Sequence, residues 1–393
     1  MLSTKSKMAV TLKRFLGAIS ILVLASSVAA LGQSITVNCD NGQSLNSTLA
    51  KLNKQIPNTV VVQGTCTEYV AIDGFEGLTL QGQPGAVVQQ PATNPRNLAY
   101  VFGIAGSRGI NVFGLTVNSL PTIFSGIGIA KGSSQVLLKN VKVTGSWGVV
   151  VSEESQVWLT GLNVTISSGY AAVSVFDKSD VHMAGGSLQR PSDNNFYVGL
   201  LVGSGHVTMQ GMTIRDMQNS INIFSSGSVD TVDVDTTQPS DVLIDNPSGT
   251  NTDGVIVSDS SSLNLGSARL LIKNAGQSAG GTTGAIFVTH NSSMSAGTGL
   301  IVSNSRGQGV VVADNSHATL AGSSITGGLH GGLVAANLST IEVQGWAGLT
   351  TVGGNAPDLF CDSSSWITGT ANLSGAPTSI CVNQLQQGYS SLP

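Results

Sequence analysis

A repeat of about 22–24 residues runs through the middle of the sequence, and it constrains the possible fold more than any other feature. In one unit, Gly148 is followed by the apolar run Val149-Val150-Val151, then by Ser155, Val157-Trp158-Leu159 and Gly161. The same order recurs in units that start at Gly126, Gly148, Ala172, Gly199, Ser220, Gly254, Ala285, Gly309 and Gly332. The steps between these starts are 22, 24, 27, 21, 34, 31, 24 and 23 residues, which indicates one shared unit with insertions.

Each unit contains three short stretches in which apolar and polar residues alternate, and a period of two is typical of β-strands. The glycine 12–14 residues after each start, replaced once by Asn140, suits the left-handed backbone of a tight turn. The turns are too short for the crossover helix of an ordinary parallel sheet. Leucine-rich repeats and propeller blades need signatures that these units lack. The unit therefore predicts a coil whose equivalent strands stack in parallel, about 4.8 Å apart.

These units resemble the coils of the right-handed parallel β-helices of the pectate-lyase-like superfamily, and the resemblance covers about residues 58–350. It implies an all-β, single-stranded right-handed parallel β-helix, which we assign to residues 58–354. The superfamily includes lyases, hydrolases, adhesins and non-catalytic surface proteins, so the resemblance alone does not select a function.

The two ends of the predicted rod lack the repeat and are expected to cover it, because stacked coils leave an open core at each end. Leu45, Leu49, Leu52 and Ile56 follow a helical spacing behind Ser44, which predicts a short amphipathic helix over 44–56 within an N-terminal cap at 33–57. Residues 355–393 are expected to form a C-terminal cap and a tail.

Residues 1–32 have the pattern of a secretory signal peptide of a bacterial type. A basic start precedes the apolar run 15–28 and a stretch of small residues. The alternative, an uncleaved membrane anchor, needs a longer apolar run of about 20 residues. The protein is therefore expected to be secreted, outside the cell, in the periplasm or on the cell surface, with no membrane span in the mature chain.

The cysteines Cys39, Cys66, Cys361 and Cys381 all lie in the exported part, near its two ends. Three pairings are possible, and loop closure favours Cys39 with Cys66 and Cys361 with Cys381, in an oxidising compartment. A zinc site is the alternative, but the chain has no C-x-x-C spacing and its histidines are distant in sequence.

Charge excludes two classes of partner. Four of the 17 basic residues and none of the 21 acidic residues lie in residues 1–32, so the remainder carries a net charge of −8. A mildly acidic chain lacks the basic surface that nucleic acid or anionic lipid requires. We expect a monomer whose partner is an extracellular polysaccharide.

The most enzyme-like string is Asn251-Thr252-Asp253-Gly254, which resembles the first motif of polygalacturonases. Those enzymes pair carboxylates across neighbouring coils. The equivalent positions in the next units are Gly284, Gln308 and Gly331, and only Leu329-His330-Gly331 loosely resembles another family motif. Asp253 is therefore a catalytic candidate whose alternative role is an ordinary turn.

An acidic stretch lies in the longest step of the repeat and contains Asp230, Asp233, Asp235, Asp241 and Asp245. Clustered carboxylates can hold Ca²⁺, and a calcium-dependent lyase would also need a base such as Arg215 or Arg269. Asp233 and Asp235 are the catalytic candidates here. The same alternation of Val and Asp is typical of any strand with one face in water.

Aromatic residues precede three successive units: Trp147, Tyr170 and the pair Phe196-Tyr197. Stacked along one edge of the rod, they would form a ladder that suits sugar rings, or alternatively they pack inside the turns. His182, His206 and His317 are expected at outward strand or turn positions of unrelated coils, and they suggest no catalytic triad. The sequence thus favours a secreted, non-catalytic scaffold that binds polysaccharide without a cofactor. A pectin-degrading lyase or glycoside hydrolase is the alternative.

Overall fold

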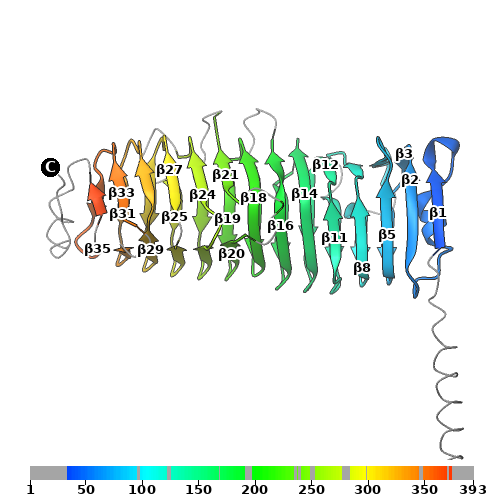
Figure 1. Cartoon of the computed structure of the whole chain (residues 1–393), viewed down its shortest axis with the longest axis horizontal. Coiled ribbons are helices and arrows are strands. Elements are labelled where there is room, and N and C mark those ends of the chain that lie inside the picture. The colour runs from blue at the N-terminus through cyan, green and yellow to red at the C-terminus, as the bar shows by residue number, and fades with distance from the viewer. Residues whose placement is uncertain are drawn as a thin grey trace, which may run out of the picture.

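The computed structural model describes residues 33–94, 98–121, 125–167, 169–190, 197–233, 237, 240–247, 253–276, 284–297, 299–344, 348–369 and 371–373. Within these residues the chain is a right-handed parallel β-helix, and its coils lie side by side along one rod (Figure 1). The predicted fold class is confirmed. The predicted signal peptide lies outside the described residues.

Each coil contributes strands to three faces of the rod. The first face, sheet 1, has 12 strands among the described residues. Its strands are β4 (Val70–Asp73), β7 (Tyr100–Ala105), β10 (Ser125–Ala130), β13 (Trp147–Val151), β15 (Ala171–Phe176), β17 (Val198–Gly203), β19 (Asn219–Phe224), β22 (Asp253–Val257), β25 (Gly284–Val288), β28 (Gln308–Val312), β31 (Leu333–Ala335) and β34 (Leu359–Cys361).

The other 24 strands of the described residues form one sheet, which folds around the rod into two faces, sheet 2 and sheet 3. Sheet 2 contains β1 (Gln33–Asn38), β2 (Asn58–Gln63), β5 (Glu76–Gly82), β8 (Arg108–Phe113), β11 (Val136–Lys139), β20 (Ser228–Thr231), β23 (Ser262–Leu265), β26 (Ser293–Ala296), β29 (His317–Ala321), β32 (Thr340–Gln344) and β35 (Trp366–Gly369). Sheet 3 contains β3 (Thr65–Thr67), β6 (Val87–Gln89), β9 (Thr116–Asn118), β12 (Lys142–Gly145), β21 (Val242–Asp245), β24 (Leu270–Lys273), β27 (Leu300–Ser303), β30 (Ser324–Thr326), β33 (Thr350–Gly353) and β36 (Ala371–Leu373). Three long strands belong to both: β14 (Gln156–Ile166), β16 (Asp180–Gln189) and β18 (His206–Arg215).

The interior is a set of apolar columns that follow the repeat. Ile129 pairs with Val151, and Val151 pairs with Val175, in successive strands of sheet 1. All three side chains are buried, with at most 1% exposed. The register that the repeat predicts for these columns is therefore confirmed.

The turn from sheet 1 to sheet 2 has a fixed construction. In many coils it places two residues in the left-handed region, such as Glu153 and Glu154, ahead of a buried serine. The backbone N–H of that serine donates to the hydroxyl of the equivalent serine in the next coil, as between Ser155 and Ser179 at 3.1 Å. The same contact joins Ser261, Ser292, Ser316, Ser339 and Ser365 in sequence. We call this column the serine ladder.

The turn from sheet 2 to sheet 3 is where the sequence predicts left-handed residues, and this prediction is confirmed in several coils. It is wrong at Gly266, whose φ lies outside the left-handed region; glycine is needed there because an added Cβ would lie 2.8 Å from the Thr231 carbonyl oxygen. Asn140 has φ +54° and Gly161 has φ +63°. A Cβ at position 161 would lie 2.5 Å from the side-chain oxygen of Asn140, so the stacking of equivalent turns also requires glycine there.

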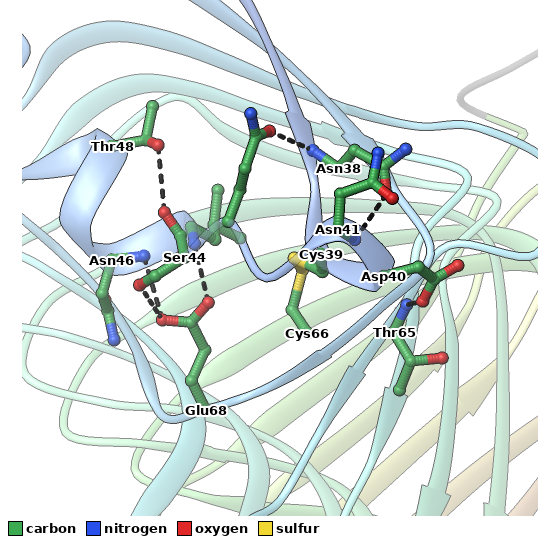
Figure 2. Close-up of a disulfide and its surroundings, with 12 residues drawn as sticks. Asn38, Cys39, Asp40, Asn41, Ser44, Asn46, Thr48, Thr65, Cys66 and Glu68 are labelled. Carbon is green, nitrogen blue, oxygen red and sulfur yellow. Dashed lines mark hydrogen bonds between the residues drawn. A yellow bond between two sulfur atoms is a disulfide. The ribbon is translucent and has the colours of Figure 1, made fainter.

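At the N-terminal end, a short 3-10 helix η1 (Cys39–Asn41) and the α-helix α2 (Leu45–Leu49) precede β2 (Figure 2). Ser44 caps α2 by accepting a hydrogen bond from Ser47 N. The helix is shorter than the predicted range 44–56. The side chain of Asn58 donates to the carbonyls of Asn53 and Ile56, and Pro57 disfavours helical backbone at the residue before it.

The disulfide Cys39–Cys66 is present, with 5.0 Å between the two Cα atoms, which confirms the predicted pair (Figure 2). Cys361 is also disulfide-bonded. Its predicted partner, Cys381, lies outside the described residues. The strand stacks extend past both ends of the predicted range 58–354, because Gln33–Asn38 and the segments after Gly354 keep the alternating pattern without the small starting residue. No helix among the described residues is long and apolar enough to span a membrane.

Candidate functional site

Trp147 and Tyr170 form an aromatic pair on the outer edge of sheet 1. Trp147 starts β13, and Tyr170 directly precedes β15 in the next coil. Their ring centroids are 5.7 Å apart with an interplanar angle of 36°, and both side chains are partly exposed. Partial burial raises the pKa of Tyr170 above its usual value. Gly169 makes the contact possible, since a Cβ there would lie 2.2 Å from Trp147 Cδ1.

The predicted ladder does not continue to Tyr197. The ring of Tyr197 is only 1% exposed and packs in the core, and its hydroxyl donates to the carbonyl of Ser167. The guanidinium of Arg190 lies 5.7 Å from the ring centroid. Tyr197 precedes its strand, so strand alternation does not fix its direction, and here it turns inward. Phe196 lies outside the described residues.

Beside the aromatic pair, the outer side of sheet 1 carries a second apolar cluster, separate from the core. Ala171, Val198 and Leu201 are buried there, and Tyr170, Phe176 and Phe224 pack against them. The Phe176 and Phe224 rings meet edge to face, 6.5 Å apart. Both approach Gly203, where a Cβ would lie 2.7 Å from Phe224 Cζ. Small residues on this face therefore let aromatic rings lie against the sheet.

The outer side of sheet 2 carries a polar group that sequence analysis missed. His182 and His206 lie in adjacent coils: Asp180 pairs with His206, and His182 pairs with Thr208. His182 Nε2 lies 3.3 Å from Asp180 Oδ2, and His182 Nδ1 is 2.5 Å from the Thr208 hydroxyl. Our expectation that these histidines fall in unrelated coils is wrong, because β16 and β18 are neighbours.

The same group extends by one coil on each side. His206 Nδ1 is 2.8 Å from the Ser228 hydroxyl, and His206 Nε2 is 3.9 Å from Asp230 Oδ2. On the other side, the Trp158 ring stacks on His182, with 5.3 Å between centroids and 21° between planes. The signal was available in the sequence, since these residues flank the central valine of the second strand in consecutive units.

The remaining acidic candidates are separated from one another. Asp241 makes an ion pair with Arg269, and Asp245 accepts a hydrogen bond from Asn274 at 2.9 Å. Asp233 is exposed after β20, and Asp235 lies outside the described residues. Among the residues with described positions, only Cys39, Cys66 and Glu68 bring three ligand atoms within 4.8 Å, and those cysteines form the disulfide.

Asp253 stands alone at the edge of sheet 1. Its neighbours in register are Asn219 on one side and Gly284, then Gln308, on the other, as the repeat predicts. Burial raises the pKa of Asp253 to about 6, although a hydrogen bond from the Gly284 N–H opposes the shift. Neither adjacent coil offers a second carboxylate in register, so the paired acids of an inverting glycosidase are not formed at this position.

No family model matches this chain, and no curated protein is significantly similar to it. The chemistry of the site must therefore be argued from the residues themselves.

Proposed function

We propose that this protein is a secreted, non-catalytic β-helix scaffold that binds extracellular polysaccharide along the outer side of sheet 1. The observation that supports this function is the partly exposed Trp147–Tyr170 pair, at a centroid distance of 5.7 Å. Aromatic rings attract the apolar faces of sugars, and a straight rod suits an extended polymer. An open face buries little area, so the binding is weak. The contact between rings and sugars needs no metal ion.

The superfamily of the protein and its location outside the cell belong to the same proposal. The coil architecture supports membership of the pectate-lyase-like superfamily. The leader-like pattern of residues 1–32 and the disulfide at Cys39–Cys66 support export from a bacterial cell. The proposed scaffold acts as a monomer. Neither nucleic acid nor membrane is a partner in this proposal.

The test is a panel of plant and bacterial polysaccharides, measured for binding by affinity electrophoresis and by calorimetry. Trp147→Ala should lower affinity for the bound polymer about tenfold, with a melting temperature within a few degrees of the wild type. Trp158→Ala on sheet 2 is the matched control and should bind normally. Full binding by Trp147→Ala would overturn the proposal, and a large loss of stability would identify the pair as packing.

A second candidate function is a lyase or hydrolase of the pectin-degrading type, and the group on sheet 2 favours it over the sequence candidates. Asp180, His182, His206 and Asp230 place two carboxylates and two imidazoles on one partly exposed surface. Such groups can act as general acids and bases. Release of reducing or unsaturated ends from polygalacturonate, abolished by Asp230→Asn, would support this function. Its absence with the wild-type protein would exclude it for that substrate.

A further inference from the structure

A cleft of about 700 Å³ opens at the N-terminal end of sheet 1, on the same side as the aromatic pair. Its lining includes Tyr69, Ala71, Leu98, Tyr100 and Gly103. Ala71 and Gly103 are paired in register on β4 and β7 and provide a floor of small side chains between the tyrosines. The volume is within the range typical of small-ligand sites.

The polar side chains of Glu68, Asn46 and Tyr69, which border the cleft, are already hydrogen-bonded. The Glu68 carboxylate accepts hydrogen bonds from the Ser44 hydroxyl and from the N–H groups of Leu45 and Asn46 (Figure 2). The Asn46 amide donates to the Tyr69 carbonyl and accepts from Ala71 N, while the Tyr69 hydroxyl donates to the Thr93 carbonyl. What the cleft presents to a ligand is therefore mainly apolar surface and ring faces.

The charge near the cleft is negative. Glu68 is the one charged side chain among the described residues that line it. The pKa of Tyr100 is raised first by burial and then by the Glu153 carboxylate, which places a second negative charge near this end of the face. An anionic ligand would meet no cationic partner among the described lining residues, so it would lose its hydration and be repelled by these carboxylates. A neutral ligand avoids both costs.

The cleft lies in line with the aromatic pair. Tyr100 pairs in register with Ser125, which pairs with Trp147, so the two aromatic residues occupy one column of sheet 1. They lie two coils apart, or about 10 Å at the usual strand spacing. Beyond the cleft the face is closed by α2, whose Asn46 side chain hydrogen-bonds the open edge of β4. A polymer that follows the column from Trp147 must end here.

We propose that this cleft binds the neutral terminal sugar of the glycan whose chain runs over Trp147 and Tyr170. The inference rests on the proposed function and adds two properties to it: recognition of a chain end, and discrimination against uronic acids at that end. The apolar face of the sugar packs on the Tyr100 and Tyr69 rings. The terminal residue fixes the direction in which the polymer lies on the rod.

The test uses the methyl glycosides of glucose, galactose and mannose, together with the three corresponding uronates, measured by saturation-transfer NMR. At least one neutral glycoside should bind, and its uronate should bind about tenfold more weakly. Ala71→Trp fills the floor of the cleft from an exposed position and should abolish the signal. Ala105→Trp, on the same face but outside the cleft lining, is the matched control.

The outcomes separate this inference from the proposed function. If Trp147→Ala loses binding to the polymer while Ala71→Trp changes neither polymer nor glycoside binding, the scaffold function stands and the end site is wrong. Equal binding of neutral and uronate glycosides, or binding of none of the neutral ones, overturns the end site as well. If no polysaccharide in the panel binds the wild-type protein, the proposed function fails, whatever the glycosides show.

Discussion

The outer sides of sheet 1 and sheet 2 are built from the same coils, yet they carry different chemistry. On sheet 1, Leu201 is only 4% exposed although it points away from the core, because Phe176, Phe224 and Tyr170 cover it. On sheet 2, the equivalent outward positions hold His182 and His206, whose ring nitrogens contact hydroxyl and carboxylate oxygens. The comparison teaches that the repeat determines the interior and leaves each outer side free to acquire its own function.

The largest expected effect comes from placing a charge on each side. Leu201→Asp should destabilise the protein by about 4 kcal/mol, because a carboxylate would replace a side chain that the rings keep dry. Ser295→Asp, at an exposed outward position of β26 in sheet 2 whose register neighbours are Asn264 and Thr319, should change stability by no more than about 0.5 kcal/mol. Urea unfolding of both variants gives the difference. Equal values would show that the outer side of sheet 1 is wetter than the structure indicates.

A pH titration probes the edge of sheet 1. Because the folded pKa of Asp253 is about 6 and its ordinary value is 3.8, the folded state binds more protons between these values than the unfolded state does. Stability should therefore fall as pH rises from about 4 to 6, by at most about 3 kcal/mol, and stay lower above that window. Asp253→Asn should remove this loss and be the more stable protein at pH 7.

The control for Asp253→Asn is built into the same titration. Well below pH 4, Asp253 is protonated in both the folded and unfolded states, so the wild type and the variant should have similar stability there. If the variant is only as stable as the wild type at neutral pH, or less stable, Asp253 is not a buried carboxylate that lacks sufficient hydrogen-bond or charge partners.

Removal of two hydroxyl groups, one on each sheet, should change the stability of the protein in opposite directions. Ser174 is fully buried on the outer side of sheet 1, and its hydroxyl has no hydrogen-bond partner. Ser174→Ala should therefore stabilise the protein by about 1 kcal/mol. Thr208 on sheet 2 is bonded to His182, so Thr208→Val should destabilise it by about 1 kcal/mol. Thermal melts of both variants measure the two changes in melting temperature. Changes in the same direction would contradict the expected difference between the two sheets.

The smallest effect concerns the glycine under the phenylalanine rings. Gly203→Ala brings a Cβ to within 2.7 Å of Phe224 Cζ and 3.1 Å of Phe176 Cδ1. The steric cost of about 1 kcal/mol is partly offset because alanine reduces the freedom of the unfolded chain, so the net loss of stability should be about 0.5 kcal/mol. NMR shifts of the Phe224 ring protons should nevertheless change. Unchanged ring shifts would mean that the rings do not lie over this glycine.

The sequence allowed the interior to be predicted, because inward residues repeat. The pairing of Val151 with Val175 and the left-handed turn at Gly161 both follow from the spacing of the units. The disulfide between Cys39 and Cys66 follows from loop closure. These features depend on positions where every coil needs the same kind of residue.

The candidate site could be predicted only in part, because outward residues do not repeat. The contact of Trp147 with Tyr170 was expected, whereas Tyr197 turns into the core from a position that alternation does not control. The association of His182 with His206 depends on which residues flank a buried valine in neighbouring coils. That information is present in the sequence, but no periodic signal draws attention to it.

The serine ladder has a consequence for how such a rod changes its length in evolution. Each rung joins a backbone N–H of one coil to a hydroxyl of the next, so every rung is made of the same two parts. After loss or duplication of a whole coil, the Ser292 N–H would meet the hydroxyl of an equivalent serine in place of Ser316. The number of coils can therefore change during evolution while the cross-section of the rod stays the same. A binding face can be lengthened in this way by one coil at a time.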